Sequence, residues 1–169
     1  MEIVNKVAQS KLITIDLEEW YPSENRITID LKDILFQGLI LREKDLREYV
    51  ANTNFEFCKD SLVNIICSAD AVVPTWAYML LSLHIQPFAK RIYFGTTEQF
   101  DSLMFEEIIA KLDVSNYQDG KIIIKGCGKL PIPTSAYVAL TNKLLPVAKS
   151  IMYGEPCSTV PLYKKKATS

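Results

Sequence analysis

The sequence of 169 residues contains few of the residues that would identify a reaction. It has one histidine, six glycines and four cysteines. Four cysteines are too few for a secreted disulfide scaffold of this length, so we expect free thiols or metal ligands in a reducing compartment. The single histidine, His84, lies near the end of a predicted helix, and no nucleophile-elbow motif accompanies it. Its expected role is a structural hydrogen bond.

The chain also lacks a long apolar run and an excess of charge of either sign. The longest apolar stretch, 71–85, is interrupted by a proline and several polar residues, so it is too broken to span a bilayer. The first ten residues lack the apolar segment of a signal peptide. The formal net charge is −1, which produces no field that would attract nucleic acid or an anionic membrane. These features predict a cytoplasmic protein without nucleic-acid or membrane partners.

Short β-branched runs alternate with helical patterns through residues 60–155, which we expect to form the core. The predicted strands are 62–67, 91–94 and 121–125, and the predicted helices are 75–86, one that starts after Thr96, and one that begins near Thr134. This alternation indicates right-handed βαβ units. The sequence therefore predicts a single α/β domain over 1–169, with a mainly parallel sheet and helices on both of its faces.

The two ends of the chain are less regular. Residues 1–55 are predicted to form an irregular N-terminal β/α extension, and 156–169 to form a C-terminal tail. The sequence Ile-Thr-Ile-Asp-Leu occurs at 13–17 and again at 27–31. Two copies of a five-residue sequence are too short for a solenoid, so we expect two short strands, in a hairpin or at a sheet edge. Residues 42–53 have the pattern of an amphipathic helix with a solvated, mixed-charge face.

The helix after Thr96 has the clearest start signal. Thr96 and Gln99 have the spacing of a capping box, in which each side chain accepts a hydrogen bond from the backbone of the other residue. The residues expected on the buried face of this helix are Phe100, Leu103, Met104, Ile108 and Leu112.

Three cysteines lie in short loops rich in small residues: Cys67, Cys127 and Cys157. If strands 62–67 and 121–125 are parallel neighbours in one sheet, Cys67 and Cys127 lie at the same sheet edge, where α/β proteins bind ligands. Helix N-termini there lower a thiol pKa, and the flanking Gly126 and Gly128 allow close approach of a ligand. Packing in the core is the alternative for each cysteine alone, and it is the expected role of Cys58.

The position of Cys157 depends on Pro146. A helix that continues through Pro146 and ends at Gly154 carries Cys157 to the opposite edge, whereas a break at Pro146 returns it to the shared edge. In the first case Cys157 could complete the site of a second subunit in a homo-oligomer. Three thiolates with an open position suit an iron–sulphur cluster or a zinc ion, although the chain has no Cys-x-x-Cys pair.

Other residues support different interpretations of the site. Thr96 and Thr97 precede a helix N-terminus, and Gly126 and Gly128 lie between two lysines, so either loop could bind an anionic small molecule. Neither loop matches a nucleotide-binding motif. Asp70 could accept a hydrogen bond from a ligand, although capping the following helix is favoured. Trp76 is a candidate for a pocket, the core or an interface. A third interpretation is a non-catalytic interaction or scaffold protein.

Four stretches of the chain carry a resemblance to a known family: 37–45, 67–78, 125–127 and 154–163. Through them nearly the whole chain resembles the domain of unknown function family 2480. The resemblance implies a cytoplasmic bacterial protein without an established activity. It also implies an association with iron–sulphur assembly proteins. We therefore hypothesise an accessory factor in iron–sulphur cluster or thiol chemistry, with a small-molecule enzyme and a scaffold as alternatives.

Overall fold

The computed structural model describes residues 11–126, 128–155 and 157–168. Its contacts divide the chain into two compact units. Unit 1 comprises Met1–Pro22 and Asp101–Ser169, and unit 2 comprises Ser23–Phe100. Each unit has a sheet and a hydrophobic core of its own. The expectation that 1–169 forms one domain stays a prediction.

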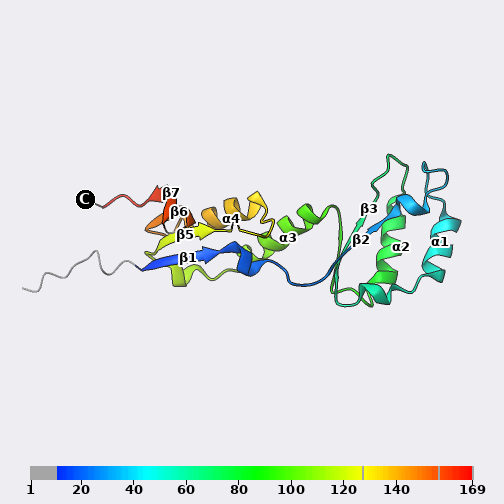
Figure 1. Cartoon of the computed structure of the whole chain (residues 1–169), viewed down its shortest axis with the longest axis horizontal. Helices are drawn as coiled ribbons and strands as arrows, with labels where there is room; N and C mark the ends of the chain where they lie inside the picture. The colour runs from blue at the N-terminus through cyan, green and yellow to red at the C-terminus, as the bar shows by residue number, and fades with distance from the viewer. Residues whose placement is uncertain (1–10, 127, 156, 169) are drawn as a thin grey trace, which may run out of the picture. The chain divides into compact units, whose positions relative to one another are not determined.

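Unit 2 is a three-stranded parallel sheet with two long helices on one face. Its elements are β2 (Arg26–Asp30), η2 (Leu31–Ile34), α1 (Glu43–Asn52), η3 (Phe55–Cys58), β3 (Leu62–Ile66), α2 (Thr75–Ile85) and β4 (Arg91–Phe94), and the strand order is β2-β3-β4. Val63 and Ile65 of the central strand belong to the same buried cluster as residues of both α1 and α2. These helices therefore share one face of the sheet, as Figure 1 shows.

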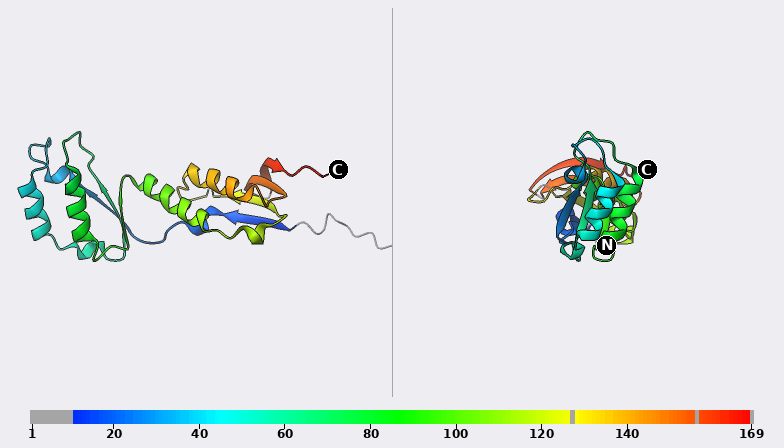
Figure 2. Two further views of the ribbon diagram at one scale, coloured as in Figure 1. Left: turned by 180° about the vertical axis from the view of Figure 1, so that it is seen from behind. Right: turned by 90° about the vertical axis from the view of Figure 1, so that its right-hand side faces the viewer.

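Unit 1 repeats this plan and adds one strand. Its elements are β1 (Leu12–Asp16), η1 (Leu17–Trp20), α3 (Thr97–Ala110, whose first turn belongs to unit 2), η4 (Val114–Tyr117), β5 (Lys121–Lys125), α4 (Thr134–Leu144), β6 (Ser150–Glu155) and β7 (Ser158–Lys164). The order is β1-β5-β6-β7, with β7 antiparallel to β6 and the other pairs parallel. Helices α3 and α4 lie together over this sheet (Figure 2).

These observations confirm the α/β class and the largely parallel pairing. The strands form two sheets, however, rather than the single sheet that the sequence suggested. The two Ile-Thr-Ile-Asp-Leu echoes provide β1 and β2, which are edge strands of different sheets. The sheet-edge interpretation is therefore correct, and the hairpin is wrong.

The C-terminal part of the prediction needs two corrections. Helix α4 ends at Leu144, before Pro146, and the chain continues as strand β6, which periodicity alone had assigned to a longer helix. The segment 156–169 includes β7, so it is not a simple tail. The β7 sequence contains a proline and several polar residues, so it has no clear strand pattern of its own. Its strand structure depends on pairing with β6.

Helix α3 begins as predicted and buries Phe100 as predicted, but its other buried positions differ from the expected ones. Thr96 N–H donates to Gln99 Oε1 at 2.9 Å, and Gln99 N–H donates to Thr96 Oγ1 at 3.2 Å, which confirms the capping box. The buried residues are Phe100, Phe105 and Ile109, together with Asp101. Asp101 is only 2% exposed, and its carboxylate accepts a hydrogen bond from the Tyr21 hydroxyl at 3.0 Å. This buried acid interrupts the apolar pattern of the helix. The apolar spacing therefore predicted a buried face about one residue away from the observed one.

The two units are copies of one structural repeat. In unit 2, Leu62 of β3 pairs with Arg91 of β4, and in unit 1 Lys121 of β5 pairs with Ser150 of β6. The first residues of β3 and β5 are separated by the same number of residues as those of β4 and β6. At this same separation, the sequence Pro-Thr-Trp-Ala-Tyr at 74–78 recurs as Pro-Thr-Ser-Ala-Tyr at 133–137. We call residues related by this spacing counterparts. Since β1 and η1 begin the repeat that α3 continues, unit 2 is inserted within unit 1.

Over the ranges that the structure describes, no helix is long and apolar enough to cross a lipid bilayer.

Candidate functional site

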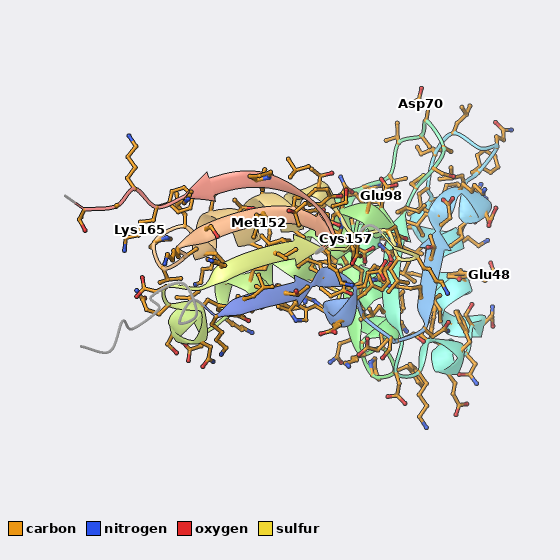
Figure 3. The ribbon with its side chains drawn as sticks, turned by 60° about the vertical axis from the view of Figure 1, so that its left-hand side comes forward. Glu48, Asp70, Glu98, Met152, Cys157 and Lys165 are labelled. Carbon is orange, nitrogen blue, oxygen red and sulfur yellow. The ribbon has the colours of Figure 1, made fainter. Side chains whose placement is uncertain are left out.

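The structure assigns the predicted cysteines to different units. Cys67 follows β3 in unit 2 and is half-buried, with Sγ 3.7 Å from the backbone oxygen of Ala69. Cys157 is exposed in the turn between β6 and β7 of unit 1. Figure 3 shows Cys157 at one end of this hairpin and Lys165 beyond its other end. Cys127 lies outside the described residues.

The geometric premise of a shared cysteine edge is therefore wrong for Cys67. Strands β3 and β5 belong to separate sheets, so the loops that follow them do not meet at one sheet edge. The constant spacing of the repeat also makes Gly126, rather than Cys127, the counterpart of Cys67. Within the described ranges, no three Cys, His, Asp or Glu residues are grouped so that they could hold a metal ion. The described residues thus do not assemble the donor set that a cluster or zinc site needs.

Cys157 lies at the edge that the broken-helix interpretation of Pro146 gives it. Strand β6 is parallel to β5, so both end at the same side of the unit 1 sheet, and Cys157 follows β6. Of the two interpretations of Pro146, the one with a broken helix is correct. Cys58 is buried in the unit 2 core, as predicted, and burial raises the pKa of its thiol.

Gly128 and Leu130, in the loop that follows β5, contact one of the chain's own carboxylates. Glu18 Oε1 accepts a hydrogen bond from Leu130 N–H at 3.0 Å. A Cβ atom at Gly128 would lie 2.7 Å from the same oxygen, so the carboxylate occupies the space that a side chain there would need. At Gly126 a Cβ atom would lie 2.7 Å from the Tyr137 hydroxyl. Both glycines therefore serve close packing within unit 1.

The cation beside this loop is also paired with acidic groups. Lys125 Nζ lies 3.5 Å from carboxylate oxygens of both Asp16 and Glu155. The charge of Glu155, and then that of Asp16, raises the pKa of Lys125. Acidic side chains from the ends of β1 and β6 thus flank the position where an anionic ligand was expected. This charge distribution disfavours an anion at the loop.

The remaining predicted residues have identifiable local surroundings. Thr96 is engaged in the capping box, and Thr97 is the exposed first residue of α3. Asp70 is exposed and points away from the ribbon at the tip of its loop (Figure 3). It does not cap α2, because Pro74 holds the N-cap position without a side-chain hydrogen bond. Trp76 lines a groove between α1 and α2.

A group of residues that the sequence interpretation missed lies at the carboxyl ends of β2 and β3. The Asp30 carboxylate accepts hydrogen bonds from Ser68 N–H, Ser68 Oγ and Lys32 N–H. Burial opposes ionisation of Asp30, but these hydrogen bonds outweigh it and lower its pKa. Burial raises the pKa of the nearby Tyr78, and the charges of Cys67 and Asp30 raise it further. The group holds the loop after β3 in place.

Each unit has a pocket at the same place in the repeat. The unit 1 pocket has a volume of about 340 Å³, and the unit 2 pocket has a volume of about 380 Å³. Four lining positions correspond between unit 2 and unit 1: Ile65 and Ile124, Tyr78 and Tyr137, Ser82 and Thr141, Phe94 and Tyr153. In both pockets the aromatic pair packs edge to face, at centroid separations of 4.8 Å in unit 2 and 5.8 Å in unit 1.

The two pockets differ in what covers them. In unit 1, β7 pairs with β6 and contributes Leu162 to the pocket lining. In unit 2, β4 is the counterpart of β6, and among the described residues it pairs only with β3. Phe94 of β4 is consequently 62% exposed. The recurrence of Pro-Thr-x-Ala-Tyr could have revealed the repeat from the sequence, but the missing strand is visible only in the fold.

Comparison with known proteins supports the resemblance of the sequence. Residues 1–165 match the family described as Protein of unknown function (DUF2480). No curated protein and no solved structure matches the chain.

Proposed function

The chain belongs to the DUF2480 family, and we propose that it is a non-catalytic interaction protein that binds an extended segment of another polypeptide along β4 of unit 2. The single observation that carries this proposal is the difference between the two copies of the repeat. In unit 1 an antiparallel strand covers the outer edge of the last parallel strand, whereas the described part of unit 2 has no such strand.

The backbone of β4 presents hydrogen-bonding groups to an incoming strand. Arg91 N–H donates to the backbone oxygen of Ser61, and the N–H of Gly95, which follows β4, donates to the backbone oxygen of Ile65. The backbone groups of alternate residues along β4 therefore face β3. The backbone groups of Ile92 and Phe94, which lie between them, face away from β3. An exposed sheet edge of this kind binds an extended peptide through backbone hydrogen bonds, while pockets for alternate side chains supply selectivity.

The pocket beside β4 defines the chemistry of the segment. Its lining is uncharged and largely apolar: Ile65, Tyr78, Met79, Ser82, Leu83, Gln86, Ile92 and Phe94. In unit 1, Leu162 of β7 is one of the residues that line the equivalent pocket. The expected ligand is therefore an antiparallel, extended segment with an aliphatic residue that enters the pocket. Because unit 1 contains such a segment, its sequence provides a defined probe.

The test is the binding of a labelled peptide with the β7 sequence Ser-Thr-Val-Pro-Leu-Tyr-Lys, measured by fluorescence anisotropy on the full chain. We expect saturable binding, and we expect replacement of the peptide leucine by aspartate to abolish it. Phe94→Lys should weaken binding about tenfold or more, because a lysine on an edge strand opposes strand addition.

Val138→Lys is the matched control, since Val138 is 57% exposed on α4 and lies outside the unit 1 pocket lining. It should bind the peptide as the wild type does, and circular dichroism should show both variants folded. Absence of saturable binding by the wild type at about 1 mM peptide, or equal binding by Phe94→Lys, would contradict the proposal.

A further inference from the structure

Helix α2 has an apolar outer face that its position in the fold does not require. The helix contains no aspartate, glutamate, lysine or arginine. Ala77, Leu81 and Ile85 fill the core side, yet Met79 and Leu83 are 63% and 71% exposed. A helix that is apolar on all sides is normally covered on all sides. The outer face of α2 is thus a candidate contact surface.

The counterpart helix shows which residues the repeat itself tolerates there. Helix α4 has Ser135 where α2 has Trp76, and Asn142 where α2 has Leu83. Both helices bury the same three positions of the repeat against their sheets. The counterpart of Met79 is Val138, which is also apolar and exposed, and the Ser135 hydroxyl is buried. Leu83 is therefore the clear difference: α4 packs on its sheet with an exposed asparagine at this position, so the packing of the helix does not require the exposed leucine of α2.

A groove runs beside this face within unit 2. It has a volume of about 350 Å³ and is lined by Glu43 and Arg47 of α1 and by Trp76, Leu80 and Leu83 of α2. Arg47 Nε and Glu43 Oε1 form an ion pair at 2.8 Å, and both side chains are well exposed. The surface therefore has three parts. The exposed side chains of Met79 and Leu83 form an apolar ridge, the groove adjoins it, and Glu43 and Arg47 provide one negative and one positive group at the rim of the groove.

We infer that a second copy of this chain docks on this surface, with the α2 ridge of each copy in the α1–α2 groove of the other. A two-fold interface uses the same patch on both copies, so the patch must be complementary to itself. The rim satisfies this condition in charge, because a two-fold axis can place Glu43 of one copy beside Arg47 of the other. Met79 and Leu83 also line the pocket beside β4, whereas Trp76, Glu43 and Arg47 do not, so variants of these three residues test the dimer separately from strand binding.

Sedimentation equilibrium of the full chain tests the inference. We expect the wild type to dimerise at about 50 µM, and Trp76→Ser, which introduces the α4 residue, to weaken the dimer at least about tenfold. Val138→Asn, an apolar-to-polar change at an exposed α4 position, is the control and should leave the dimer intact. A wild type that is monomeric at about 100 µM would overturn the inference.

A charge exchange tests the two-fold arrangement itself. Arg47→Glu and Glu43→Arg should each weaken the dimer, because like charges then face each other twice. An equimolar mixture of the two variants should form a heterodimer, since the opposite charges face each other again. Failure of the mixture to associate would exclude this arrangement. Trp76→Ser should still bind the β7 peptide, so loss of the dimer and failure of the strand-binding proposal are distinguishable.

Discussion

The carboxylate of Asp30 accepts two hydrogen bonds from Ser68, one from its N–H at 3.0 Å and one from its hydroxyl at 2.5 Å. Asp30 ends β2, and Ser68 belongs to the loop that follows β3. These bonds therefore join the ends of two neighbouring parallel strands and position the loop that contains Cys67. Asp30 also caps η2 through Lys32 N–H, so a single carboxylate satisfies three donors.

Asp30→Asn should destabilise the protein by about 1–2 kcal/mol at neutral pH, because it weakens a cap and charge-assisted hydrogen bonds. Since folding lowers the pKa of Asp30, its contribution to stability is complete above the aspartate pKa of the unfolded chain. This contribution is lost as the pH falls through the lowered pKa. Urea unfolding between neutral and acidic pH should therefore show the gap between wild type and variant closing at low pH.

Asp16→Asn is the matched control for this experiment. Asp16 caps η1 through Glu18 N–H at 3.0 Å, as Asp30 caps η2, but it is not the acceptor for Ser68. Ser68→Ala should reproduce part of the Asp30→Asn effect. A gap that stays constant across the acidic range would show that Asp30 does not contribute through its ionised form.

Gly126→Ala should destabilise unit 1 by about 1–3 kcal/mol, the usual cost of overpacking. The added Cβ atom would lie 2.7 Å from the Tyr137 hydroxyl and 3.2 Å from Leu17 Cβ. Removing the hydroxyl with Tyr137→Phe should restore part of the loss in the double variant. Thermal unfolding measures both effects. If the double variant is no more stable than the sum of the single changes predicts, the close approach of Tyr137 is not what requires glycine here.

The cysteines should differ sharply in their reaction with a thiol reagent. Cys157 is exposed and should react quickly in the folded protein, whereas Cys58 is buried with a raised pKa and should react only after unfolding. Cys157→Ser should remove the fast phase of reaction with an aromatic disulfide, and Cys58→Ser should not. A fast phase that survives Cys157→Ser would contradict the assigned exposure.

Serine variants of the three predicted site cysteines test the iron–sulphur hypothesis, which stays a prediction. Protein purified anaerobically would be assayed for iron, zinc and acid-labile sulphide, together with Cys67→Ser, Cys127→Ser and Cys157→Ser. The separate units of Cys67 and Cys157 lead us to expect that no metal depends on all three cysteines. Stoichiometric metal that is lost in every variant would contradict this expectation.

Local patterns predicted the elements that depend on neighbouring residues. The capping box at Thr96 and Gln99 formed as expected, because its two hydrogen bonds lie within one helical turn. The strands at 62–66 and 121–125 followed from short β-branched runs. The predicted helix end before Pro87 is confirmed. The sequence does not decide the similar end before Pro146, because the apolar residues beyond it continue a helical spacing.

The candidate site depended on a relationship between distant segments, and there the local patterns were insufficient. Cys67 and Cys127 both follow apolar strands, but nothing in either stretch specifies which sheet its strand joins. The short echoes at 13–17 and 27–31 indicated strands without indicating their partners. The recurrence of Pro-Thr-x-Ala-Tyr contains the missing information, since it pairs the two copies of the repeat.

By itself, the sequence determined the α/β class, the family and most element boundaries, because apolar spacing, capping residues and prolines act over a few residues. Only the tertiary structure decided that β1 pairs with β5 and β2 with β3, so that one unit is inserted in the other. It also decided that Glu18 occupies the glycine loop and that β4 lacks the covering strand of its counterpart in the described chain. These features arise from contacts between segments up to about a hundred residues apart, which backbone pairing and burial select together.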